Sequence, residues 1–149
     1  MALNKNQISV LKFLELGKSI ECKTKFQKMM FLSQVEEGSN TSYSFQKYHY
    51  GPFSFGFSDD LNALTQLGFI KTTNVMWGVS DGQPAVRTTF ELSPEGLKEL
   101  KENESELDEK TLTAIKKVLS WNDKPLGEVL NYVYSKYMGN DNPKLAIIE

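Results

Sequence analysis

Residues 51–77 read GPFSFGFSDDLNALTQLGFIKTTNVMW, a pattern that indicates a capped helix followed directly by a strand. Ser54 can cap the helix, in which apolar side chains recur at i, i+4, i+8 and i+11, the spacing of one buried face. These side chains are Phe53, Phe57, Leu61 and Leu64. β-Branched and aromatic residues predict a strand over 69–77, and a second strand over 86–92 faces it across turn residues at 78–85. We therefore expect a helix beside an antiparallel hairpin with a long loop.

Two helices and a short strand are predicted ahead of this stretch. Apolar residues at helical spacing predict the first helix over about 8–17. Thr24 and Gln27 have the spacing of a capping box that begins a second helix, which runs to about residue 37. Residues 43–50 form a strand-like aromatic run that a glycine and a proline then stop. Three helices and a hairpin outline a winged helix, with the short strand inserted in its usual turn.

The last third of the chain is predicted to be helical. Ser93 and the proline after it open a short helix, Ser105 opens another, and a final helix follows Pro125. The apolar stripes of these helices must pack on the hairpin domain or on a second copy of the chain. We therefore expect an α+β fold, mainly α, with a winged-helix core over 1–92. A C-terminal helical extension over 93–149 packs on that core.

Composition narrows the functional classes. The 149 residues are 40% hydrophobic, enough for one domain with a real core, and 17 basic against 19 acidic residues give a net charge of −2. This charge excludes a polybasic protein that holds nucleic acid non-specifically. One cysteine and one histidine cannot build a metal site, so we expect no metal and no cofactor. We also expect a cytoplasmic protein with no membrane partner, because no leader or spanning segment is recognisable.

Three stretches in order carry a family resemblance: residues 24–32 (TKFQKMMFL), 48–54 (YHYGPFS) and 61–70 (LNALTQLGFI). Their order resembles the YwgA-like proteins and, more distantly, the Panacea domain found in SocA-like antitoxins. Residues 130–137 (LNYVYSKY) are similar to the closing helix of that family. The resemblance implies a winged-helix core and a regulatory or antitoxin-like role, and it carries over no catalytic residues.

Residues with catalytic potential lie near the same helix. His49 and Ser54 could be combined with Asp59 or Asp60, but the nucleophile context that such a triad needs is missing from the sequence. The paired aspartates are better explained by the positive end of the helix dipole. Cys22 has no second cysteine and no catalytic pattern near it. We therefore expect a protein that is not an enzyme.

The aromatic residues between 43 and 57 are the most unusual local feature. Alternation sends only part of this group inward, and Phe53 and Phe57 belong to the buried stripe of the helix. The remaining rings either pack under the C-terminal helices or form an exposed patch of the kind that binds proteins. The leading hypothesis is a non-enzymatic, antitoxin-like regulatory protein that binds a protein partner or a second copy through Tyr48, Tyr50 and Phe55.

The alternative hypothesis is a DNA-binding winged-helix transcription regulator. Its reading helix would be the third helix, and its contacts would come from the polar and cationic residues Lys23, Lys25, Lys28, Ser58, Asn62, Gln66, Lys71 and Arg87, with Phe55 beside them. The charge of that helix disfavours DNA, because the helix contains Asp59 and Asp60 and no cation, and would repel the phosphate backbone.

Overall fold

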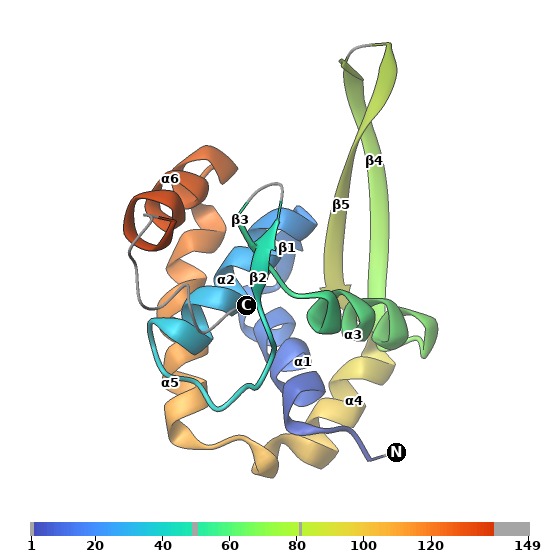
Figure 1. Ribbon diagram of the computed structural model, residues 1–149. Coiled ribbons are helices and arrows are strands. Elements are labelled where there is room, and N and C mark those ends of the chain that lie inside the picture. The colour runs from blue at the N-terminus through green and yellow to red at the C-terminus, as the bar shows by residue number, and fades with distance from the viewer. Residues whose placement is uncertain (1, 49–50, 81, 139–149) are drawn as a thin grey trace.

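The structure is a computed structural model that describes residues 2–48, 51–80 and 82–138 (Figure 1). It confirms an α+β protein that is mainly helical with small antiparallel sheets. The helices and strands are α1 (Lys5–Gly17), β1 (Ser19–Glu21), α2 (Lys23–Val35), β2 (Gln46–Tyr48), β3 (Gly51–Phe53), α3 (Phe55–Gln66), β4 (Ile70–Ser80), β5 (Gln83–Leu92), α4 (Pro94–Asn103), α5 (Glu109–Val118) and α6 (Leu126–Tyr137). Two 3-10 turns connect the last helices, η1 (Glu104–Glu106) and η2 (Leu119–Asp123).

The β4–β5 hairpin is longer than the sequence pattern indicated. The two strands stay paired as far as Ser80 and Gln83, so the loop predicted over 78–85 is wrong. The β-branched residues near its end favour extended backbone, and Gly82 supplies the positive φ of 76° that a tight turn needs. The hairpin therefore projects from the helical body as a two-stranded ribbon (Figure 1).

The short strand β1 was not predicted. It pairs antiparallel with β5, which gives the sheet order β1-β5-β4, and it places buried Ile20 opposite Phe90. Three residues are too few to show an alternating pattern, so the sequence gives no local signal for this strand.

The aromatic run before α3 folds as a hairpin rather than as one strand. Gly51 and Pro52, expected to stop a strand over 43–50, begin β3, which pairs antiparallel with β2. Proline is tolerated in this position because β3 lies at the edge of a two-stranded sheet.

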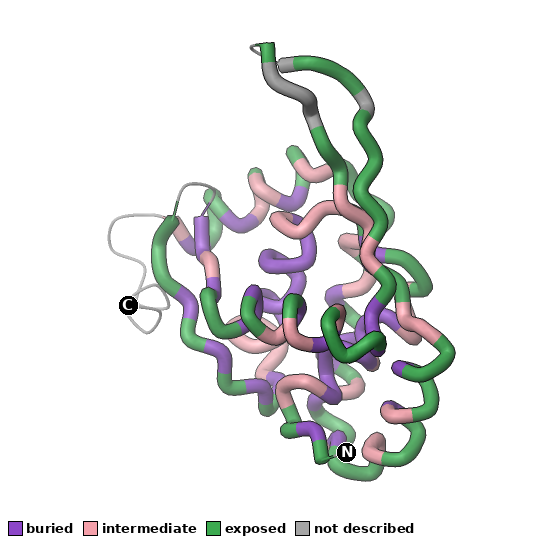
Figure 2. The backbone as a smooth tube through the Cα atoms, turned by 90° about the vertical axis from the view of Figure 1, so that its right-hand side faces the viewer, coloured by how far each residue is buried: buried purple, intermediate pink, exposed green. Residues whose placement is uncertain are grey.

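Helix α2 lies at the centre of the helical body. All nine side chains over 25–33 are buried. The ring of Phe26 makes edge-on contacts with the rings of Phe13, Phe57 and Phe90 at centroid distances of 5.7, 5.0 and 5.8 Å. One hydrophobic core takes side chains from both sides of residue 92. Figure 2 shows that burial is concentrated in this body, whereas the projecting hairpin is exposed.

Side-chain caps begin several of the helices. Ser54 and Ser93 cap α3 and α4 as predicted, by accepting hydrogen bonds from backbone N–H groups three residues ahead. The start predicted at Ser105 is wrong, because this residue lies in η1 and Asp108 caps α5. The Asp108 carboxylate accepts from the Thr111 N–H at 2.9 Å, so α5 begins three residues later than expected.

The capping box predicted for α2 does not form. Cys22 is the N-cap residue and makes no side-chain cap bond. Gln27 instead faces the start of α3, where its Nε2 donates to the Ser54 carbonyl and its Oε1 accepts from the Ser54 N–H, both at 2.9 Å. Ser54 is buried, and its backbone groups therefore need these partners.

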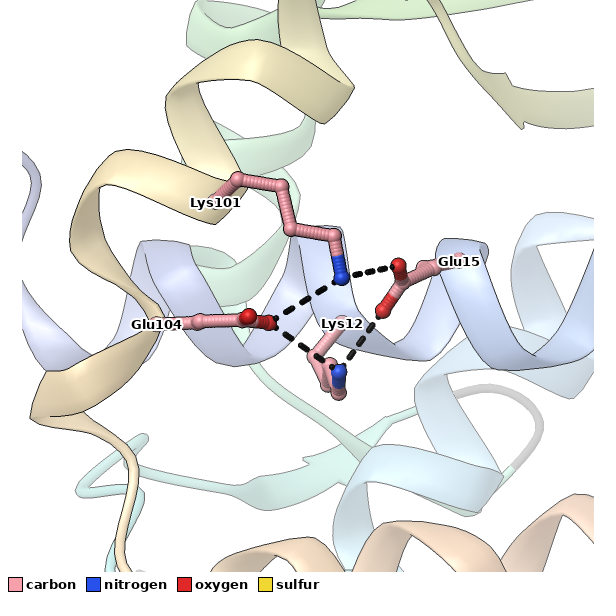
Figure 3. Close-up of polar contacts among 4 residues, drawn as sticks. All are labelled: Lys12, Glu15, Lys101 and Glu104. Carbon is pink, nitrogen blue, oxygen red and sulfur yellow. Dashed lines mark hydrogen bonds and ion pairs between the residues drawn. The ribbon is translucent and has the colours of Figure 1, made fainter.

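An ion-pair network joins α1 to α4 and η1 (Figure 3). Lys12 Nζ lies 2.7 Å from Glu15 and 3.3 Å from Glu104, and Lys101 Nζ lies at the same two distances from these carboxylates. Burial raises the pKa of Glu15, but hydrogen bonds from both lysines outweigh it and hold that pKa below its usual value.

Helix α6 is tied to the end of α2 through Glu36. One carboxylate oxygen of Glu36 accepts hydrogen bonds from Tyr132 Oη at 2.6 Å, Lys136 Nζ at 2.7 Å and Tyr137 Oη at 2.5 Å. Burial raises the pKa of Glu36, and the three donors together lower it below its usual value.

Candidate protein-interaction site

Three aromatic rings meet on the surface where the β2–β3 hairpin leads into α3. Tyr48 lies 5.2 Å from Phe53 and 5.5 Å from Phe55, and the last two rings are 5.0 Å apart, all as centroid distances. Tyr48 is 47% exposed and Phe55 48% exposed, while Phe53 is half-buried. We call these three residues the aromatic patch.

Contacts around Ser54 orient the patch. The Gln27 amide fixes the backbone of Ser54, and the Ser54 hydroxyl accepts from the Phe57 N–H at 3.1 Å. Phe57 is then fully buried, and Phe55, about 200° away around the helix, faces outward. The exposure of Phe55 therefore follows from where α3 begins.

The other aromatic residues of this stretch are internal. The ring of Tyr43 packs against Phe57 at 5.4 Å, and the ring of Phe45 packs against Phe31 at 5.3 Å. Tyr43 Oη donates to Asp60 at 2.6 Å, and burial, with this bond, raises the pKa of Tyr43 far above its ordinary value. Tyr43 and Phe45 are therefore buried against α3 and α2, whereas Tyr48 and Phe55 are exposed.

Phe53 does not lie where the sequence predicted it. Phe53 was expected in the buried stripe of α3, and that is wrong: it precedes the helix, in β3, where its ring contacts the exposed Tyr48 and Phe55. Alternation of Phe53 and Phe55 across Ser54 was the signal in the sequence that could have placed both on one side. Tyr50, expected in the same patch, lies outside the described residues.

The outward face of α3, a helix described in full, carries no cation. Asp59, Asn62 and Gln66 are exposed, and Leu67 just beyond the helix is 45% exposed. Ser58 was expected to face outward, but it is buried, because it lies one residue after Phe57 and three before Leu61 on the core side. This face is neutral to acidic and partly apolar.

Two lysines expected to meet phosphates are buried instead. Lys28 Nζ donates to the Pro52 carbonyl at 2.9 Å and Lys25 Nζ to the Asn122 carbonyl at 3.1 Å. Desolvation lowers the pKa of Lys28 to about 8. The prediction that these lysines contact DNA is wrong, because α2 is enclosed by the C-terminal helices and β3.

The remaining predicted cations lie apart from the aromatic patch. Lys71 is exposed on β4, and Arg87 on β5 forms an ion pair with Glu21 of β1. Lys23 borders an open pocket of about 660 Å³ between the start of α2, β5 and residues 123–126. These residues do not gather on the face of α3.

The candidate catalytic residues have structural partners. The Ser54 hydroxyl caps α3, and the Asp60 carboxylate accepts from Tyr43 and, at 3.3 Å, from Gln7. His49 lies outside the described residues. Among the residues that the structure describes, no three His, Cys, Asp or Glu side chains are grouped so that they could hold a metal ion.

Comparison with protein families, with curated proteins and with solved structures gave no match for this chain. Within the described part of the chain, none of the helices has the length and apolar character needed to cross a membrane.

Proposed function

We propose that this protein is a non-enzymatic regulatory protein that binds another protein through the aromatic patch. The observation that carries the proposal is the cluster of Tyr48, Phe53 and Phe55, two of whose rings are almost half exposed at the start of a rigidly capped helix. Exposed aromatic groups in contact with one another are typical of the centre of a protein interface, where they act as anchors.

We propose further that the first part of the chain is a winged-helix core with the C-terminal helices packed on it. The order α1, β1, α2, α3 and the β4–β5 hairpin supports this assignment, with the β2–β3 hairpin inserted between α2 and α3, as does the sheet order β1-β5-β4. The resemblance to the YwgA-like proteins and to the Panacea domain of SocA-like antitoxins supports an antitoxin-like role.

The same topology favours the second candidate, a DNA-binding regulator, and charge argues against it. A reading helix needs donors and cations near the phosphates, whereas the exposed side of α3 carries Asp59 and no lysine or arginine along its described length. With Lys25 and Lys28 buried, the phosphate contacts proposed for α2 are reduced to Lys23.

The test compares the full chain with Phe55→Ala and with Leu97→Ala as a matched control, because Leu97 is an exposed side chain of α4. Proteins captured from the source lysate are quantified, and each candidate partner is then titrated as a purified protein. We expect a partner that binds the parent chain and the control, and that loses about 2 kcal/mol of binding energy with Phe55→Ala. A partner set that Phe55→Ala and Tyr48→Ala both leave unchanged contradicts the proposal.

Stability measurements separate binding from folding. Phe55→Ala should change the free energy of unfolding little, whereas Leu61→Ala should cost about 2–5 kcal/mol through the cavity it leaves. Nanomolar affinity for one duplex sequence, abolished by Asn62→Ala or Gln66→Ala, would establish the DNA-binding alternative instead.

A further inference from the structure

A second surface lies on the projecting hairpin, away from the aromatic patch. Met76 pairs with Val86 across the hairpin, and Val79 pairs with Pro84, which lies two positions before Val86 on β5. The side chains of Met76, Val86 and Val79 therefore share one face. They are exposed by 66%, 57% and 75%. Natural proteins protect such ribbons with charges, but Asp81 is the only charged residue between Lys71 and Arg87.

The end of this apolar face at Val86 lies beside the helical body. Val86 and Phe90 alternate onto the same side of β5, and Phe90 packs against Phe26 in the core. Val86 also lines the open pocket of about 660 Å³, together with the start of α2 and residues 123–126. The pocket thus meets the apolar face of the hairpin at Val86, and we call the pocket together with this end of the face the groove.

The backbone edge of β5 is open along this groove. β1 ends at Glu21, and the Cys22 N–H then donates to the Thr88 carbonyl at 2.7 Å. Because backbone groups alternate in direction along a strand, the next N–H and C=O that face outward are those of Val86. In the described residues no strand pairs with this edge beyond Thr88. Pro84, the next outward position after Val86, has no N–H, so the edge offers the Val86 N–H and the carbonyls of Val86 and Pro84 to an extended backbone.

The pocket end of the groove is cationic although the whole chain is acidic. Four cations border it, Lys23, Lys25, Arg87 and Lys124, against the two acids Glu21 and Asp123, which leaves a surplus of two positive charges. Glu21 and Arg87 neutralise each other, and the Lys25 ammonium is bound to the Asn122 carbonyl. Lys23 and Lys124 are therefore the cations available to an acidic ligand.

We propose that this groove binds an extended acidic segment of a partner protein by strand addition to β5. The segment would pair with the Val86 backbone, place an apolar side chain against Val86, and direct a carboxylate to Lys23 and Lys124. Strand addition of this kind draws affinity from backbone bonds and specificity from alternate side chains. The proposal does not rest on the aromatic patch.

Two other occupants fit less well. The acidic stretch of this chain, residues 91–109, forms the end of β5, α4 and η1, so a second copy offers that charge mainly on helices and not on an extended strand. Nucleic acid would meet an apolar ribbon whose sequence between Lys71 and Arg87 holds no cation.

The experiment uses the full chain and a random 12-residue peptide library displayed on phage. We expect enriched peptides that combine an aspartate or glutamate with an apolar residue. A fluorescein-labelled synthetic copy of one such peptide is then titrated by anisotropy. The Lys23→Glu/Lys124→Glu double variant should weaken its affinity by about tenfold or more. The control Lys98→Glu/Lys116→Glu makes the same charge change at exposed positions outside the groove and should have little effect.

A second pair of variants tests backbone pairing. Val86→Pro removes the outward N–H at an edge where proline is tolerated, whereas Val86→Thr keeps that N–H. The proline variant should weaken the peptide by about tenfold and the threonine variant much less, with circular dichroism confirming that both remain folded. Phe55→Ala should bind the peptide normally, so failure of the aromatic-patch proposal and failure of this one are distinguishable.

Several outcomes overturn the inference. These are no enrichment from the library, enrichment of basic peptides, an affinity unchanged in the Lys23→Glu/Lys124→Glu variant, and an oligothymidine 20-mer that binds the parent chain but not this variant. A dimer of the parent chain that Val86→Pro dissociates would likewise assign the groove to a second copy.

Discussion

Helix α2 and the β4–β5 hairpin reverse the usual placement of residue types. In α2, Lys25, Gln27 and Lys28 are buried, and each donates to a backbone carbonyl of another segment. In the hairpin, valines and a methionine lie exposed. The position of an element in the topology therefore decides which of its side chains are buried. A central helix can bury polar groups when each is bonded, and a projecting ribbon exposes apolar ones that a partner can cover.

The largest expected effect contrasts the two regions directly. Phe26→Ala removes the ring that contacts Phe13, Phe57 and Phe90, and it should lower the free energy of unfolding by about 3–5 kcal/mol. Met76→Ala on the hairpin should change it by less than about 0.5 kcal/mol. Urea denaturation of both variants measures these energies. Equal losses would show that the hairpin is as much a part of the core as α2.

The buried lysine of α2 should make stability depend on alkaline pH. Burial lowers the pKa of Lys28 to about 8, and in the unfolded chain it returns to about 10.4. Between these values the unfolded state binds more protons, so stability rises with pH, by roughly 3 kcal/mol over the whole window. Below pH 8 both states are protonated and this gain is absent.

Lys28→Met tests that dependence, because it removes the titrating group while keeping an unbranched side chain. The difference in unfolding free energy between the parent chain and Lys28→Met should shift in favour of the parent chain from pH 7.5 to pH 10. A difference that stays constant over this range would mean that Lys28 keeps its ordinary pKa in the folded protein.

The packing of α6 against the end of α2 should depend on the Glu36 carboxylate. Glu36→Gln replaces a charged acceptor of three hydrogen bonds and should cost about 1–2 kcal/mol of stability. The matched control is Glu37→Gln, which removes a 3.5 Å ion pair to the exposed Lys117 and should cost less than about 0.5 kcal/mol.

The stabilisation that Glu36 provides should also depend on pH. Its folded pKa is below the unfolded value, so its stabilisation is present above the unfolded pKa, about 4.3, and is lost as pH falls through the folded pKa. Between pH 7 and acidic pH, the parent chain should therefore lose more unfolding free energy than Glu36→Gln does. Parallel acid transitions would contradict this.

The smallest expected effect concerns the ion-pair network on the surface of the body. Glu15→Gln weakens its contacts with Lys12 and Lys101 and should cost about 0.5–1 kcal/mol at low salt. The part of this loss that comes from the half-exposed Lys101 should shrink in 1 M NaCl, because salt screens exposed charges more than buried ones. A loss that is independent of salt would indicate a packing defect instead.

Local signals in the sequence predicted much of the helical part. The caps at Ser54 and Ser93, the buried face of Phe57, Leu61 and Leu64, and the mainly α-helical class all follow from spacing and capping chemistry within a few residues. The exposure of Phe55 was predictable for the same reason, because helical rotation fixes its direction relative to Phe57.

The tertiary structure alone decided which partner each segment meets. The sequence could not show that Gln27 would bond the backbone of Ser54 rather than cap α2, or that β1 would pair with β5. It could not show that Gly96 must be glycine, where an added Cβ would lie 2.0 Å from the Phe69 carbonyl. Caps and periodicity act between neighbours in the chain, whereas burial of Lys28 and exposure of the hairpin depend on segments distant in sequence, whose positions only the assembled fold determines.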